Sequence, residues 1–153
     1  MAEQQQQQFA VQRLYVKDVS FEAPQGAAVF TKQWQPEVKV DLNTKNAKVT
    51  DDQYEVVLTV TITAQLEGEV AFLIEAQQAG LFLVQGLDEE QLRRALGIMS
   101  PNLLFPYVRE VIDSMAIKGG FPAIGLQPVN FEALFMQAQQ QAAAQQAAPA
   151  EQH

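Results

Sequence analysis

A regular alternation of apolar and polar side chains over residues 54–64 constrains the fold more than any other feature of the sequence. Every second residue from Val56 to Ile62 is apolar, and threonines stand on the other face at positions 59, 61 and 63. Successive side chains of an extended strand point to opposite faces, so the pattern indicates a β-strand with one buried and one open face. Such strands are typical of antiparallel sheets.

Three further segments have the character of strands. Residues 37–43 and 70–77 alternate in the same way, and residues 9–22 mix β-branched and aromatic side chains with polar ones. Two turn signals, an aspartate pair at 51–52 and Gly68, separate neighbouring strands.

The second half of the chain has helical spacing. Asp88 is expected to cap a helix that Gly97 and Pro101 interrupt, and Asn102 is expected to cap the next helix. Apolar side chains over residues 103–115 form an arc broad enough to pack against two surfaces. Strands followed by helices predict an α+β fold with an antiparallel sheet.

The length of 153 residues suits a single domain. We expect residues 1–8 to be a disordered Gln-rich N-terminus and residues 9–136 to form the folded domain, whose last helix Asn130 caps. Residues 137–153 are expected to be a mobile Gln/Ala-rich tail, in which the alanines favour continuation of the helix.

Charge and composition limit the partners. The chain has 18 acidic and 10 basic residues and a net charge of −8, which disfavours nucleic acid and anionic membranes. Its N-terminus lacks the basic and apolar regions of a signal peptide, and its longest apolar runs are far too short to insert in a membrane. The absence of cysteine fits a reducing compartment, so we expect a cytoplasmic protein.

The sequence offers little for catalysis. It has no cysteine, and its one histidine is the last residue, His153. The Asp51-Asp52 pair reads as a turn rather than as an acid–base pair, and the chain has neither a Gly-rich phosphate loop nor a serine elbow. We therefore expect a binding protein without metal or cofactor, not an enzyme.

A set of acidic side chains is the first candidate binding surface. Asp18, Ser20 and Glu22 point the same way on a strand, and Leu73 and Glu75 share the polar face of theirs. If the two strands are neighbours, they form an acidic patch with one apolar residue in it, which suits a basic protein partner. The alternative is an ordinary solvated sheet face.

Aromatic side chains are the second candidate. Phe21, Phe30 and Trp34 lie in a segment interrupted by two prolines and a glycine, which indicates a loop or crossover rather than a core strand. They either anchor the loop to the core or line a groove for apolar segments of another chain.

Motifs that lie in series along residues 9–136 resemble the SecB family of bacterial protein-export chaperones. They are Lys17–Pro24, Trp34–Lys39, Tyr54–Leu58, Ala71–Leu73, Pro101-Asn102, Leu104–Tyr107, Arg109-Glu110, Pro128–Phe131 and Ala133–Met136. The resemblance implies a four-stranded antiparallel sheet followed by helices, packed in a homotetramer that is a dimer of dimers. It implies a chaperone that holds secretory precursors unfolded without ATP or cofactor and delivers them to the translocation ATPase SecA.

The resemblance also implies site residues. The positions that match the family's SecA contacts are Asp18, Glu22, Leu73 and Glu75. The positions that match its client groove are Phe30, Trp34, Val40, Leu42 and Phe135. The C-terminal tail departs from the family's usual acidic pattern. Alternatives are a SecB-like chaperone of a non-export or toxin–antitoxin system, a scaffold for one folded partner and, least supported, a hydrolase.

Overall fold

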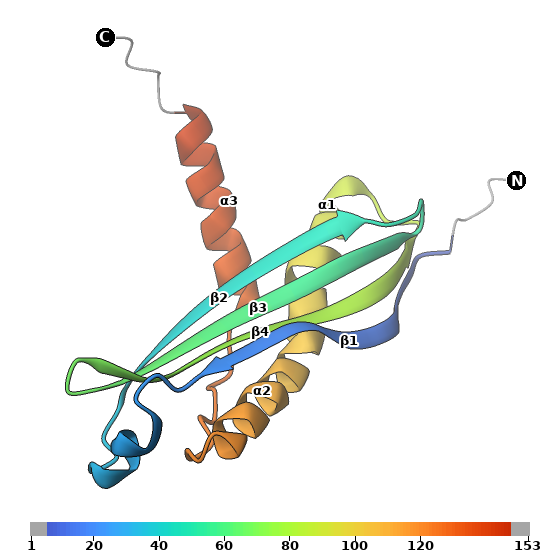
Figure 1. The fold of residues 1–153 in the computed structure, drawn as a ribbon. Helices are drawn as coiled ribbons and strands as arrows, with labels where there is room; N and C mark the ends of the chain where they lie inside the picture. The colour runs from blue at the N-terminus through green and yellow to red at the C-terminus, as the bar shows by residue number, and fades with distance from the viewer. Residues whose placement is uncertain (1–5, 148–153) are drawn as a thin grey trace, which may run out of the picture.

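The computed structural model describes residues 6–147, which form a four-stranded antiparallel sheet with helices on one of its faces (Figure 1). The elements, in chain order, are β1 (Gln8–Glu22), a 3-10 turn (Gly26–Thr31), β2 (Glu37–Lys48), β3 (Gln53–Leu66), β4 (Glu69–Gln85), α1 (Glu89–Arg94), a π-helical turn (Ala95–Met99), α2 (Ser100–Lys118) and α3 (Phe131–Ala147). The predicted α+β fold of a sheet followed by helices is confirmed.

The strands lie in the order β1-β4-β3-β2, so the first two strands form opposite edges of the sheet. The connection between them, residues 23–36, therefore crosses one end of the sheet. The β3–β4 hairpin closes through Glu67 and Gly68, both at positive φ (51° and 81°). Such a turn matches the right-handed twist of two paired strands.

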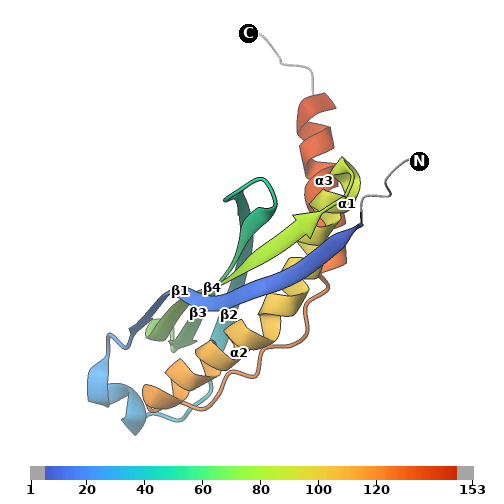
Figure 2. The same ribbon diagram turned by 90° about the vertical axis from the view of Figure 1, so that its right-hand side faces the viewer.

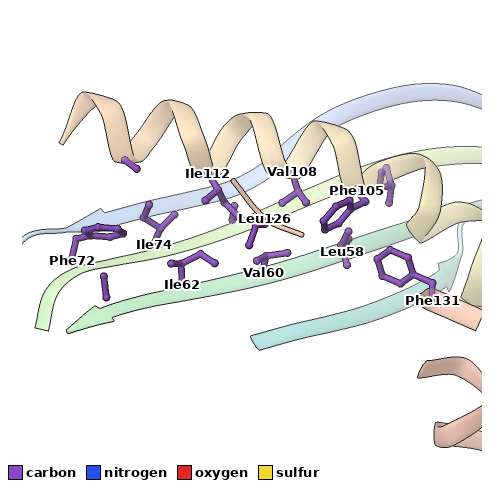
Figure 3. Close-up of a cluster of buried hydrophobic side chains, with 14 of the residues drawn as sticks. Leu58, Val60, Ile62, Phe72, Ile74, Phe105, Val108, Ile112, Leu126 and Phe131 are labelled. Carbon is purple, nitrogen blue, oxygen red and sulfur yellow. The ribbon is translucent and has the colours of Figure 1, made fainter. Parts of the chain in front are cut away.

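The core lies between the sheet and α2 (Figures 2 and 3). Val108 and Ile112 point from α2 toward Val60 and Ile74 on β3 and β4, and all four are fully buried. The alternation predicted for residues 54–64 thus gives β3 a buried helix face. We call the other side of the sheet its open face.

The break expected between the first two helices does not occur. Pro101 has no N–H to donate to Gly97, and the chain widens into the π-helical turn Ala95–Met99 instead of ending. The Ser100 hydroxyl donates to the Ala95 carbonyl over 2.9 Å. Asn102 therefore lies exposed inside α2, and the prediction that it caps a helix was wrong.

Polar contacts fix α3 at its start. Asp113 on α2 accepts hydrogen bonds from the backbone N–H groups of Ile124 (3.0 Å) and Gly125 (3.1 Å), which holds the linker against the domain. Asn130 caps α3 as predicted, since its side-chain oxygen accepts from the Ala133 N–H over 3.0 Å. The helix continues to Ala147, into the Gln/Ala-rich segment; residues 1–5 and 148–153 lie outside the described range.

Candidate binding surfaces

The predicted SecA-binding residues meet on the open face of the sheet. Strands β1 and β4 are neighbours, and Glu22 lies directly opposite Leu73, while Ser20 lies opposite Glu75. Asp18 follows two positions along the same face. We call Asp18, Glu22, Leu73 and Glu75 the acidic patch. The prediction depended only on β1 and β4 being neighbours. They are neighbours, and their register brings all four residues together.

The carboxylates of the acidic patch have no internal partner in the part of the chain that the structure describes. The ion pairs found there involve other acidic side chains, among them Glu55 with Lys17 and Asp41 with Lys39. Asp18 and Glu22 are exposed. Their charges are therefore available to a basic partner, and Leu73 adds a half-buried apolar contact among them.

Four crossover and strand aromatics gather around Phe121, which follows α2. Its ring centroid lies 4.6 Å from Phe72, 5.1 Å from Trp34, 5.3 Å from Phe30 and 6.5 Å from Phe21. We call these five rings the aromatic cluster. Phe121 and Phe72 are buried and Trp34 is half-buried, whereas Phe30 stays 56% exposed. The rings thus anchor the crossover to the core, as one of the two interpretations expects, while Phe30 keeps most of its surface open.

An uncovered apolar row continues from the aromatic cluster along β2. Val38, Val40 and Leu42 lie on the helix face, because Val40 pairs with the buried Ile62. Helix α2 packs on β4 and β3 and leaves this edge strand bare, so Val38 and Val40 remain 43% and 42% exposed. We call the three residues the β2 row.

A cleft of about 520 Å³ extends the β2 row toward α3. Thr44 and Asn46 of β2 form one side of it, and Phe131, Leu134 and Phe135 of α3 form another. From Val38 to Asn46 the strand spans roughly 26 Å, which is the length of about eight extended residues. Phe135 thus lines a cleft beyond the β2 row, at the end away from Trp34, together with Thr44 and Asn46 on the same face of β2.

The position of Phe135 depends on Gly97. A Cβ atom at residue 97 would lie 2.6 Å from Phe135 Cδ2, closer than real Cβ contacts. We expect Gly97→Ala to push Phe135 off the π-helical turn and to loosen the start of α3. Amide hydrogen exchange should rise in residues 131–140 by about tenfold. Gly26→Ala is strained at its φ of +58° but has open space around its Cβ, so it should perturb its own turn and leave α3 unchanged.

Sequence reasoning missed the base of the aromatic cluster. The sequence pattern assigns no role to Phe121 and places Phe72 only within the strand expected at residues 70–77. A large aromatic side chain directly after a helix-ending Gly119-Gly120 pair was the available signal, because such residues often anchor a loop to the core.

The acidic patch and the apolar surface lie on opposite faces of one sheet. Glu75 pairs with Thr61 on the open face, and the next β3 residue, Ile62, is buried on the helix face opposite Val40. Within residues 6–147 no three metal-binding side chains come together, and no helix is long and apolar enough to cross a membrane. The two candidate surfaces are therefore separate, one on each face of the sheet.

Comparison with known proteins decides the family. Residues 2–142 match the model of the family described as preprotein translocase subunit SecB. The chain belongs to the SecB family. A member from Hahella chejuensis, a protein-export protein, is 58% identical over 143 residues, which cover 94% of this chain and 90% of that protein. Both the resemblance and the predicted export-chaperone function are confirmed.

A solved structure shows the same fold at much lower identity. The SecB-like chaperone of Mycobacterium tuberculosis, in complex with a ChAD peptide from an antitoxin, has a TM-score of 0.63 and 12% sequence identity, and the match covers 79% of this chain and 90% of that one. The much higher identity to a SecB export protein disfavours the toxin–antitoxin alternative for this chain.

Proposed function

We propose that this SecB-family chain acts in the cytoplasm as an ATP-independent holdase, without a catalytic step, that keeps secretory precursors unfolded and passes them to SecA. The observation that carries the proposal is the partly exposed apolar surface of Trp34 and the β2 row, which the cleft lined by Phe135 extends. The surface is long enough for an extended segment of a client, and no other element within residues 6–147 closes over it. The acidic patch on the opposite face supports a second, simultaneous partner.

Client capture at this surface needs no particular sequence. Burial of one large apolar client side chain contributes about 1.5–3 kcal/mol, and ordering of the client offsets part of it. One surface alone therefore binds short peptides weakly. Several copies joined in one assembly raise the apparent affinity by about a hundredfold or more when one client spans them.

We propose that the assembly is a homotetramer, a dimer of dimers. Helix α2 exposes Tyr107 and Ile117 on the side away from its own sheet, and Met99 is exposed just before it. The broad apolar arc of this helix thus has one side on the sheet and one side available to another subunit.

Unfolded-client binding is the direct test of this proposal. The mass of the protein in solution should be that of a tetramer, and a reduced, unfolded secretory precursor should add to it without ATP. A native folded protein should not bind. If the chain instead binds the native protein and does not bind the unfolded one, it is a scaffold for a folded partner.

Trp34→Ala should weaken capture of the unfolded precursor by about tenfold, because it removes the largest half-open ring at the start of the surface. The matched control is Val49→Ala, which truncates another exposed apolar residue in the β2–β3 turn. Calorimetric titration of the same precursor measures both. An unchanged affinity in Trp34→Ala would remove Trp34 from the client surface.

A further inference from the structure

The side chains of β1 do not keep the strand period of two. Leu14 and Phe21 both pack on the core although they are seven positions apart, and Tyr15 and Asp18 both lie on the open face although they are three apart. The register explains this, since Val16 lies opposite Gln78 and Asp18 lies opposite Gln77. Lys17 is therefore the extra residue of a β-bulge, one position before the acidic patch.

Side chains from β4, its neighbour, and from β3, the strand beyond it, hold this bulge in place. Gln78 is 4% exposed, and its amide donates to the Tyr15 carbonyl over 3.2 Å. Glu55, two strands away, accepts from Lys17 Nζ at 2.8 Å and from the Tyr15 hydroxyl. A buried amide and a carboxylate with two donors thus converge on residues 15–17, where the regular ladder is interrupted.

The protonation states of Glu55 and Tyr15 favour the hydrogen bond between them. The hydrogen bonds from Lys17 and Tyr15 lower the pKa of Glu55. Burial, together with the Glu55 carboxylate, raises the pKa of Tyr15 to about 12. Near neutral pH Glu55 is therefore ionised and Tyr15 keeps the proton that it donates.

The position of the bulge decides which charge faces the partner. If the extra residue moved one position along the strand, Lys17 would lie opposite Gln77, and its ammonium group would take the place of the Asp18 carboxylate. A one-residue slip moves a side chain to the other face of a sheet. Because adjacent positions here carry opposite charges, such a slip would change the sign of charge at one end of the acidic patch.

We propose that Glu55, Gln78 and Tyr15 are positioning residues for partner docking, which fix the bulge at Lys17 so that Asp18 stands in the acidic patch. The inference rests on the proposed docking of SecA to that patch. None of the three residues needs to touch the partner, since each acts through the backbone or the side chain of residues 15–17.

The test removes the contacts that hold the bulge while it preserves side-chain size. Glu55→Gln together with Gln78→Met should weaken SecA binding by about fivefold or more and leave affinity for an unfolded precursor unchanged. Nuclear Overhauser contacts between residues 18 and 77 should weaken in the same protein. If this variant does not fold, Tyr15→Phe replaces it and should give the same effects at smaller size.

Deletion of Lys17 should rescue SecA binding in the variant with Glu55→Gln and Gln78→Met. It would not do so if that variant had a general structural defect. Without the extra residue, Val16 and Asp18 occupy adjacent ladder positions with their present orientation, so no bulge is needed. The deletion alone should retain SecA binding, and the deletion combined with Glu55→Gln and Gln78→Met should restore it to within about twofold of the unaltered protein.

Asp18→Ala in the same titration separates this inference from the proposed function. If Asp18→Ala does not weaken SecA binding, the proposed docking surface is wrong. If Asp18→Ala weakens binding but the Glu55 and Gln78 variant does not, the positioning role is wrong. Loss that the deletion of Lys17 fails to restore also overturns it, because Glu55 then acts by direct contact or through stability.

Discussion

Replacement of Glu75 by lysine is expected to weaken SecA binding by about fiftyfold or more, the largest effect of any single change on the open face. Glu75 lies opposite Ser20, and Asp18 and Glu22 are its diagonal neighbours on β1. Diagonal positions across paired strands are about 7–8 Å apart, within reach of a lysine side chain. The new ammonium group therefore removes one carboxylate and also pairs with the two that remain.

Titration calorimetry at two salt concentrations measures this effect. The loss should shrink as ionic strength rises, because exposed charges are screened over about 8–10 Å near physiological salt. Glu90→Lys is the matched control, with the same change of charge on exposed α1. Affinity for an unfolded precursor should not change in either variant. Equal loss of SecA and precursor binding in Glu75→Lys would show that the two faces do not act separately.

The sequence predicts those structural features that depend only on residues close together in the chain, and it misses those that depend on a partner element. The alternation in β3 predicts its buried face, because Val56, Leu58 and Ile62 need only their own spacing to define it. The bulge at Lys17 needs a partner strand for its definition, so β1 alone could not reveal it. At Pro101 a local rule predicted a helix break, but the burial of Ala95, Leu96 and Ile98 keeps the chain helical through a wider turn.

The candidate sites divide in the same way. The acidic patch followed from strand alternation together with one assumption, that β1 and β4 are neighbours, and the sheet order satisfies it. The β2 row could not be separated from an ordinary buried face, because the sequence does not show that α2 stops short of the edge strand. The resemblance implies a client role for Val40 and Leu42. The structure leaves Val40 42% exposed and packs Leu42 partly against the core.

Phe121→Ala is expected to lower the free energy of unfolding by about 3–5 kcal/mol, a large effect for one substitution. The side chain is 5% exposed and contacts every other ring of the aromatic cluster. Its removal leaves a cavity beneath Trp34 and Phe30. We expect the crossover to loosen, so capture of an unfolded precursor should fall although Phe121 itself is buried.

Trp34 is the only tryptophan of the chain, so its fluorescence reports on the crossover directly. Phe121→Ala should shift the emission of the folded protein to longer wavelength, because water reaches the indole. Leu104→Ala is the control, a fully buried truncation at the other end of α2 that should cost about 2–5 kcal/mol without moving the emission. A normal emission in Phe121→Ala, with precursor affinity retained, would show that the crossover holds its shape without this ring. The client surface would then be set by β2 and α3 rather than by the aromatic cluster.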